Sequence, residues 1–185
     1  HSTSKFESIS LSNFKVRGYV ELSNVSSFPV TFIHKDAVRN DVVSILYVGR
    51  IVRHKRLFEA IELLELHENI TLTIVGPVED LQYWSEIQND RIYKMSIDRI
   101  TYLGSLVKSD VLKEMNRHDI LVLLSKSENF AHVIAEALHC GMRIIKSNGV
   151  PWSLPDNIGL DWPFSYQKGK LFLSSQAKSE HKADM

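Results

Sequence analysis

The chain has 185 residues, of which 44% are hydrophobic and 24% charged, and its 22 Lys and Arg balance its 22 Asp and Glu. This is the composition of an ordinary folded protein, long enough for one well-buried domain with some extra segments. The zero net charge argues against a nucleic-acid partner. The single cysteine excludes an internal disulfide and fits a reducing compartment. No apolar stretch approaches the ~20 residues that span a bilayer.

The predicted elements begin after residue 40. Residues 1–40 are rich in Ser, Val and Phe, and we interpret them as a connector with one or two short strands. Strands and helices then alternate, and the apolar spacing predicts strands at 44–48, 71–75, 100–103, 120–124 and 143–146, with helical segments at 55–67, 79–98, 109–117 and 131–140. After Gly149 two prolines indicate an extended loop, and residues 166–185 are expected to be a frayed tail.

This alternation predicts an α/β fold over residues 41–165, a Rossmann-like parallel sheet with helices on both faces. The predicted strands all end in small residues, which are Gly49, Gly76, Gly104, Ser125 and Ser147. In an open parallel sheet, ligands bind outside the carboxyl ends of the strands. We therefore expect the functional residues directly after these small residues.

The first strand-to-helix turn carries cations. Residues 48–55 contain one glycine, Gly49, so the G-x-G-x-x-G dinucleotide motif is absent, and neither a phosphate loop nor a G-x-S-x-G elbow occurs elsewhere. Arg50 follows the strand and Lys55 opens the helix. Two cations there suit a diphosphate, because they neutralise the charge that grows on a departing phosphate. Each of them taken alone is more simply a solvated surface residue.

Two carboxylates accompany the turn after the fourth strand. Glu128 lies in this polar turn, and His132 and Glu136 share the polar face of the helix that starts near Ala131. Backbone N–H groups at a helix start form an anion site. Ionised carboxylates accept hydrogen bonds, so they can bind the hydroxyl groups of a ligand. Together with the anion site, they suit a ligand in which a diphosphate is flanked by two polyols. A sugar nucleotide is such a ligand.

These residues resemble those of the retaining GT-B glycosyltransferases. Glu128-x7-Glu136 is similar to their E-x7-E motif, and Gly49-Arg50 with Lys55 is similar to their G-R-x-x-x-x-K turn. The resemblance is strongest to the family-four enzymes of bacterial O-antigen and surface-polysaccharide assembly. It extends in order through segments 74–77, 102–104, 128–138 and 150–159, and residues 1–7 resemble the end of the N-terminal domain of that family.

The resemblance implies a role for each residue. Arg50 and Lys55 would contact the donor diphosphate and Glu128 the transferred sugar, and these three form the expected catalytic set. Glu136 would hold the ribose hydroxyls. The other expected donor-binding residues are Gly49, Gly76, Ser105, Leu106, Asn129, Phe130, Ala131, His132 and Val133.

The implied reaction is retaining hexosyl transfer from a nucleotide sugar, with a UDP-sugar favoured, by front-face attack without an enzyme nucleophile. We expect no metal and no other cofactor, and the eight histidines and Cys140 show no zinc-ligand spacing. Ala131 and Arg56 stand where the family usually has glycine, which leaves the donor sugar open.

The implied acceptor is a saccharide, free or lipid-linked, bound by an N-terminal domain outside this sequence. We therefore expect this chain alone to bind donor weakly and to transfer nothing. The implied location is cytoplasmic, with peripheral contact to the inner face of the cytoplasmic membrane, and no nucleic-acid partner is expected. Two alternatives stay open, a GT-B sugar-nucleotide epimerase and a non-catalytic nucleotide-sensing or interaction domain.

Overall fold

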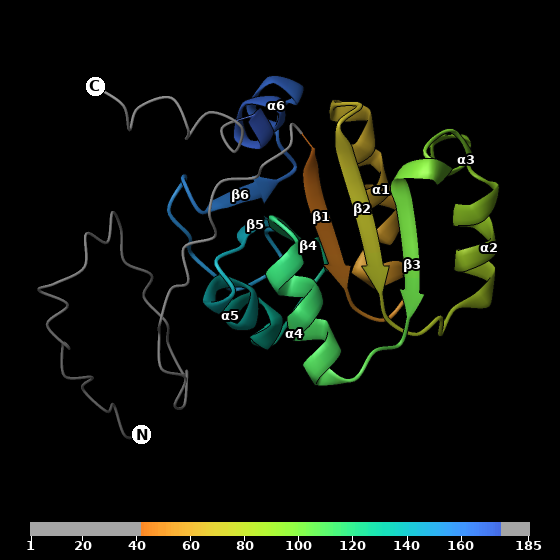
Figure 1. Cartoon of the computed structure of the whole chain (residues 1–185), viewed down its shortest axis with the longest axis horizontal. Helices are drawn as coiled ribbons and strands as arrows, with labels where there is room; N and C mark the ends of the chain where they lie inside the picture. The colour runs from red at the N-terminus through yellow and green to blue at the C-terminus, as the bar shows by residue number, and fades with distance from the viewer. Residues whose placement is uncertain (1–41, 175–185) are drawn as a thin grey trace, which may run out of the picture.

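Six strands form one parallel sheet in the computed structural model, which describes residues 42–174 (Figure 1). In chain order they are β1 (Val43–Val48), β2 (Ile70–Val75), β3 (Ile100–Gly104), β4 (Ile120–Leu123), β5 (Arg143–Ser147) and β6 (Gly159–Trp162). Their order across the sheet is β3-β2-β1-β4-β5-β6, and every neighbouring pair is parallel. The predicted fold class is confirmed, whereas the predictions for residues 1–41 and 175–185 lie outside the described residues.

Helices cover both faces of the sheet (Figure 1). One face carries α1 (Leu57–Glu62), α2 (Leu81–Asn89), α3 (Arg91–Met95) and α6 (Tyr166–Ser174), and the other carries α4 (Lys108–Arg117) and α5 (His132–His139). Three short 3₁₀ turns, η1 (Arg53–Lys55), η2 (Leu63–Leu66) and η3 (Ile97–Arg99), join these elements. None of the helices within residues 42–174 is long and apolar enough to cross a membrane.

Two hydrophobic cores follow from the alternation of side chains along the strands. On β1, Ile45 and Tyr47 pack into the core beneath α1 and α2, while Leu46 packs into the core beneath α4 and α5. A strand covered on both faces needs a continuous apolar sequence, because successive side chains point to opposite faces. The apolar runs of β1 and β4 therefore belong at the centre of the sheet, and this is where the two strands lie side by side.

The predicted helical regions are more divided than expected. Residues 79–98 form α2, α3 and η3, because Asp80 and Asp90 each begin a new helix. The Asp80 carboxylate accepts a hydrogen bond from the Tyr83 N–H at 2.8 Å, and that of Asp90 accepts one from the Ile92 N–H at 2.6 Å. Both aspartates thus satisfy N–H groups that a helix start leaves unpaired.

Two elements within residues 159–174 differ from the prediction. β6 lies in the region expected to be irregular, and residues 166–174 form α6 instead of a frayed tail. Phe172 and Leu173 of α6 are buried in the core beneath α1 and α2. The Arg143 guanidinium on β5 donates a hydrogen bond of 2.7 Å to the Phe172 carbonyl and lies 3.4 Å from the centre of its ring. Tertiary burial, rather than a sequence pattern, therefore stabilises this short helix.

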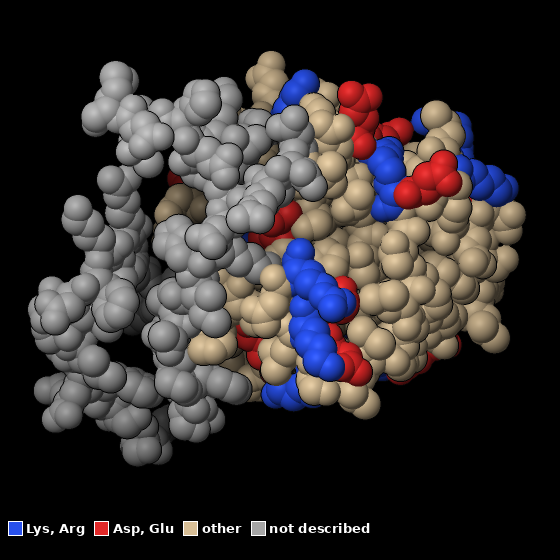
Figure 2. All heavy atoms as spheres, in the orientation of Figure 1, with Lys and Arg blue, Asp and Glu red and all other residues tan. Residues whose placement is uncertain are grey.

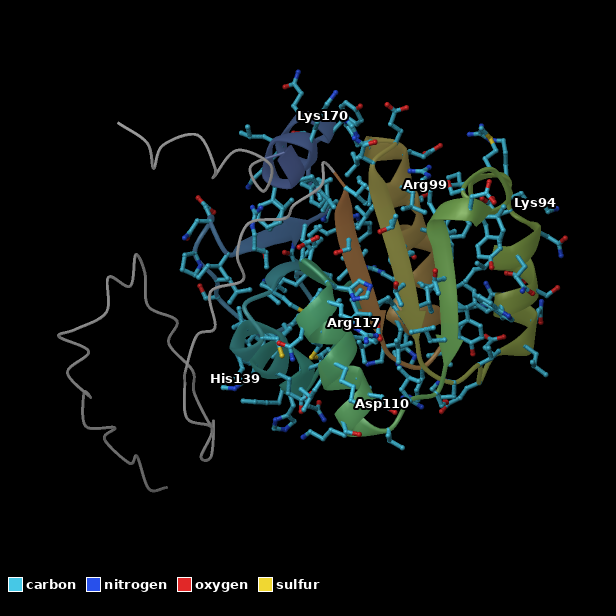
Figure 3. All side chains as sticks on the ribbon, viewed as in Figure 1. Lys94, Arg99, Asp110, Arg117, His139 and Lys170 are labelled. Carbon is cyan, nitrogen blue, oxygen red and sulfur yellow. The ribbon has the colours of Figure 1, made fainter. Side chains whose placement is uncertain are left out.

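Charged side chains gather over α4 on the face shown in Figure 2, beside an uncharged surface over β2 and β3. On this helix Lys113 pairs with Asp110 at 2.7 Å, and Arg117 pairs with Glu114 at 2.8 Å. Figure 3 labels Asp110 and Arg117 on α4. Both cations are about two thirds exposed, so these pairs within one helix contribute little to stability.

Asp119 joins the start of β4 to the start of β1. Its carboxylate accepts hydrogen bonds from the Ser44 N–H at 2.8 Å and the Ser44 hydroxyl at 2.6 Å. We expect Asp119→Ala to lower the free energy of unfolding by about 2 kcal/mol, because it leaves two part-buried donors without their charged acceptor. Urea denaturation measures this loss. Asp98→Ala in η3 is the control, since Asp98 is exposed, and an equally small effect of both changes would contradict the prediction.

Candidate functional site

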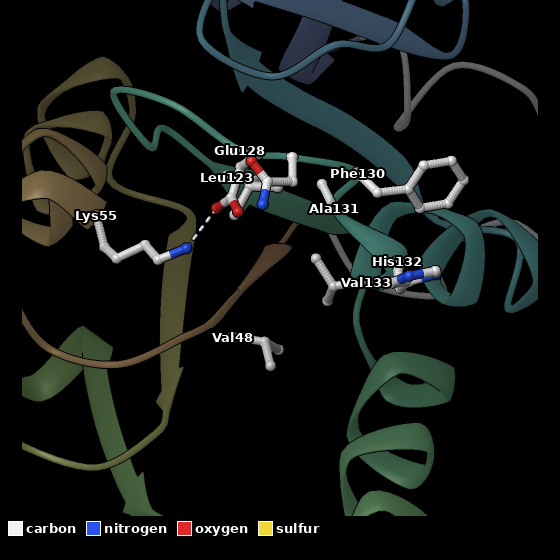
Figure 4. Close-up of a pocket in the computed structure, with 9 residues that line it drawn as sticks. Val48, Lys55, Leu123, Glu128, Phe130, Ala131, His132 and Val133 are labelled. Atoms are coloured by element: carbon white, nitrogen blue, oxygen red, sulfur yellow. Dashed lines mark hydrogen bonds and ion pairs between the residues drawn. The ribbon is translucent and has the colours of Figure 1, made fainter. Parts of the chain in front are cut away.

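A pocket of about 410 Å³ opens at the carboxyl ends of β1 and β4 (Figure 4). Its volume lies within the range of sites for small molecules. The chain leaves β1 toward β2 and β3 and returns on the other side at β4, so the pocket lies where the strand order reverses. Its walls come from the end of β1, from η1 and from the β4–α5 turn, and the lining residues are Val48, Lys55, Leu123, Glu128, Asn129, Phe130, Ala131, His132 and Val133.

Lys55 and Glu128 form an ion pair in this pocket (Figure 4). The Lys55 Nζ lies 2.5 Å from Glu128 Oε1, and each side chain is 16% exposed. The Ser125 hydroxyl at the end of β4 donates a second hydrogen bond to the same oxygen, at 2.6 Å. In the sequence Ser125 stands out only as a small residue after a strand, so this contact was not predicted.

The Glu128 carboxylate is kept ionised by these contacts. Burial acts to raise its pKa, but the hydrogen bonds from Lys55 and Ser125 and the charges of Lys55 and His54 outweigh it, so the pKa lies below its usual value. An ionised carboxylate accepts hydrogen bonds and donates none. The pocket therefore combines a cation for an anionic group with an acceptor for hydroxyl groups.

Three loops interlock behind the ion pair. The Lys126 N–H donates to the His54 carbonyl at 2.8 Å, and the Glu128 N–H donates to the Gly149 carbonyl at 2.9 Å. A β-carbon on Gly149 would lie 2.0 Å from the Lys126 carbonyl oxygen, so only glycine fits there. The loops after β1, β4 and β5 thus hold the pocket in one shape. The role of Gly149 was not predicted, because its tight contact is with Lys126, 23 positions earlier in the chain.

The β4–α5 turn ends in an unusual backbone conformation. Ala131 is the N-cap of α5, with φ 58° and ψ 58°, in the left-handed region that costs a non-glycine residue about 1 kcal/mol. Its methyl group cannot cap the helix, so it does not compete for the first N–H groups of α5. Ala131 therefore restricts the backbone of this turn more than a glycine would.

The aromatic side chains of this turn point away from the ion pair (Figure 4). The Phe130 ring lies 4.5 Å from the exposed His132 ring and 5.9 Å from that of Trp152. The buried Trp152 donates from its indole N–H to the Phe130 carbonyl at 2.6 Å. Trp152 therefore supports the turn from behind rather than lining the pocket.

Arg50 lies outside the pocket lining. Its side chain is 52% exposed and pairs with Glu79 at 2.8 Å. Its carbonyl accepts a hydrogen bond of 3.0 Å from the buried Tyr47 hydroxyl. Burial first, and then the nearby Tyr83, Glu128 and Glu59, raise the pKa of Tyr47, so its hydroxyl keeps the proton that holds this loop.

Arg56, the second departure from the glycine pattern, also lies outside the pocket lining. It is the N-cap of α1, with φ 54° and ψ 47°, again in the left-handed region. Its guanidinium lies 5.0 Å from the centre of the Trp162 ring and 3.6 Å from Glu59. Its side chain thus packs against β6 instead of covering the pocket.

The ends of β1, β2 and β3 are tied together by glycines. The Gly49 N–H donates to the Val75 carbonyl at 2.9 Å, and the Gly76 N–H donates to the Gly104 carbonyl at 2.8 Å. The Gly76 carbonyl accepts a hydrogen bond of 3.0 Å from the Tyr102 hydroxyl. Gly49 and Gly76 do not line the pocket and instead shape the loops beside it.

Glu136 lies one turn beyond His132 on α5, outside the lining of the pocket. Its carboxylate, 18% exposed, pairs with Lys108 at 2.9 Å. Ser105 and Leu106, in the loop between β3 and α4, also lie outside the lining. Across residues 42–174, no group of three or more His, Cys, Asp or Glu side chains is arranged to hold a metal ion.

Comparison with protein families gives one match over most of this region. The family described as glycosyl transferases group 1 matches residues 31–153. One subunit of the human phosphatidylinositol N-acetylglucosaminyltransferase is 28% identical over 136 residues, which cover 70% of this chain and 28% of the human protein. This chain therefore spans less than a third of that relative.

Solved structures share the fold. HepE from Anabaena, in complex with UDP and glucose, is 19% identical, with a TM-score of 0.63 over 75% of this chain and 40% of that one. The C-terminal domain of LpcC from Francisella tularensis, a glycosyl transferase group 1 family protein, is 24% identical, with a TM-score of 0.60 over 73% of this chain and 75% of that one. This chain thus corresponds to a part of HepE and to most of the isolated LpcC domain.

Proposed function

Because this chain belongs to the glycosyl transferases group 1 family, we propose that it binds a UDP-sugar at the pocket of Lys55 and Glu128 and supplies the donor half of a retaining transfer. The observation that carries this proposal is the ion pair. One pocket holds both a cation and a hydroxyl acceptor at the carboxyl ends of adjacent strands. A sugar diphosphate needs both, because its phosphates are anionic and its sugar presents hydroxyl groups.

The roles follow from the chemistry of the two groups. Lys55 contacts the β-phosphate and neutralises the charge that grows there as the bond to the anomeric carbon breaks. Glu128 accepts a hydrogen bond from a hydroxyl of the transferred sugar. The acceptor hydroxyl attacks from the face that the phosphate leaves, and its proton passes to the departing phosphate oxygen. This front-face path retains the anomeric configuration without an enzyme nucleophile or a metal.

Binding breaks the ion pair that the structure shows. Lys55 then turns from Glu128 to the diphosphate, while Ser125 continues to hold the carboxylate through its hydrogen bond. Arg50 exchanges the exposed Glu79 for the diphosphate in the same way, which costs little because both side chains are about half exposed. In this proposal each cation has a temporary protein partner before the donor arrives.

UDP is the nucleotide that the similar structures favour. HepE is described in complexes with UDP and with UDP-glucose. We propose that Glu136 holds the ribose of the nucleotide and that the loop of Ser105 and Leu106 borders its base. Asn129, Phe130, Ala131, His132 and Val133 then surround the phosphate and sugar with backbone and side-chain groups.

We propose a saccharide acceptor that is lipid-linked and bound outside the residues described. The human relative supports a lipid acceptor, since its name describes the transfer of N-acetylglucosamine to phosphatidylinositol. The role in bacterial surface-polysaccharide assembly, at the inner face of the cytoplasmic membrane, rests on the resemblance of the sequence motifs. The family match favours transfer over sugar-nucleotide epimerisation.

Calorimetric titration of the chain with UDP, GDP and the corresponding sugar nucleotides tests this proposal. We expect UDP to bind with a dissociation constant of about 0.1–1 mM, since the site has few buried polar contacts, and GDP to bind at least about fivefold more weakly. A UDP-sugar is expected to bind more tightly than UDP, because Glu128 then gains a hydroxyl partner. Absence of binding by every nucleotide, with the fold intact, would replace the transferase proposal with an interaction domain.

A further inference from the structure

We propose that Lys108 positions Glu136 for the ribose hydroxyls, acting through their ion pair without contacting the nucleotide itself. This inference rests on the proposed function, because it assigns Glu136 to the ribose. Lys108 is the first residue of α4, and Glu136 lies in the second turn of α5. Their ion pair of 2.9 Å therefore connects the two helices that cover this face of the sheet.

Lys108 differs from the other cations of α4. Lys113 and Arg117 each pair with a carboxylate three residues away on α4 itself. Lys108 reaches across to α5, although its side chain is as exposed as theirs, at 68% compared with 67% and 70%. Among the ion pairs described for α4, this is the one that joins the helix to another element.

The Glu136 carboxylate that Lys108 contacts is mostly buried and can still accept further hydrogen bonds. Glu136 is only 18% exposed. On either side of it, Ile134 and Ala137 of α5 are buried in the core beneath α4 and α5. The ammonium group of Lys108 contacts Oε1, so Oε2 and the second lone pair of Oε1 can still accept hydrogen bonds. Two such acceptors match the adjacent 2′- and 3′-hydroxyls of a ribose.

An oriented carboxylate binds more tightly than a free one. A glutamate side chain loses up to about 2 kcal/mol of conformational entropy when it is held in one rotamer. The pair with Lys108 restricts Glu136 before the ligand arrives, so less of this entropy is lost on binding. Lys108 also follows directly after the loop of residues 105–107, so its ion pair connects that loop to Glu136.

Titration with UDP and with 2′,3′-dideoxy-UDP, which lacks both hydroxyls, tests the inference. Lys108→Ala is expected to weaken UDP binding about two- to fivefold, the range for an exposed ion pair, and to leave dideoxy-UDP binding unchanged. In a Glu136→Ala background, Lys108→Ala should have no further effect. Lys113→Ala is the matched control, because it removes an equally exposed cation from the same helix.

The outcomes separate the inference from the function on which it rests. Equal weakening of UDP and dideoxy-UDP by Lys108→Ala would mean that Lys108 attracts the phosphates directly, and this would overturn the positioning role. Unchanged UDP binding by Lys108→Ala would also overturn it, while binding by the wild type would still support the proposed function. Absence of UDP binding by the wild type would overturn both.

Discussion

Replacing Lys55 with alanine is expected to weaken UDP binding by about ten- to a hundredfold, because a charge-assisted hydrogen bond contributes about 1.5–3 kcal/mol. Two effects act in the same direction. The diphosphate loses a cation in a part-buried pocket, and Glu128 is left as an unpaired negative charge beside it. Calorimetric titration measures the loss. Lys94→Ala on α3 removes an exposed lysine away from the pocket and should leave the affinity within twofold.

Glu128→Ala is expected to change UDP binding in the opposite direction to Lys55→Ala. Removing this carboxylate frees Lys55 and removes a repulsive charge, so UDP should bind more tightly than it does to the wild type. The additional affinity of a UDP-sugar over UDP should disappear. Glu114→Ala is the matched control, since Glu114 is 15% exposed and also pairs with a cation, Arg117, but on α4. Weaker UDP binding by the Glu128 variant would contradict the assignment of this residue to the sugar.

Gly76→Ala is expected to cost roughly 3–5 kcal/mol of stability, the sum of a backbone clash and a strained dihedral angle. The β-carbon would lie 1.9 Å from the Gly49 carbonyl oxygen, and φ of this residue is 145°. The clash is between two backbone segments, so no side chain can move to relieve it. We expect a thermal midpoint lower by more than about 10 °C, measured by circular dichroism.

Gly104→Ala separates the clash from the dihedral strain. Gly104 also ends a strand and has a positive φ of 68°, but an added β-carbon there meets nothing within 4 Å. The expected cost is about 1 kcal/mol, that of the left-handed conformation alone. Similar losses for both variants would show that the close approach of the β1 and β2 loops is not what requires glycine at Gly76.

The strands were the most predictable part of the fold. The five predicted strands agree with β1 to β5 within one residue at each end, because each is a run of apolar residues bounded by polar or small ones. β6 has four residues and contains the exposed Asp161, so no periodicity marks it. Its position comes from pairing with β5, where Gly159 lies beside Ile144. Such pairing depends on distant residues that a local pattern does not contain.

The site was predictable in position but not in its contacts. Lys55 and Glu128 follow adjacent parallel strands, so their proximity follows from the topology alone. Their ion pair depends on side-chain conformation, as do the pair of Arg50 with Glu79 and that of Glu136 with Lys108. These long side chains have several rotamers of similar energy, and the sequence does not choose among them.

Arg56 and Ala131 adopt the left-handed conformation at the starts of α1 and α5. A glycine at either position would relieve about 1 kcal/mol of strain, but it would also give the unfolded chain more conformations, which costs about 0.4–1 kcal/mol. Because these terms nearly cancel, the larger residues change the free energy of unfolding little. They restrict instead the backbone conformations that the loops before α1 and α5 can adopt in the folded protein. The start of α5, which lines the pocket with His132 and Val133, is thus restrained before a ligand arrives, and a ligand loses less entropy in ordering it.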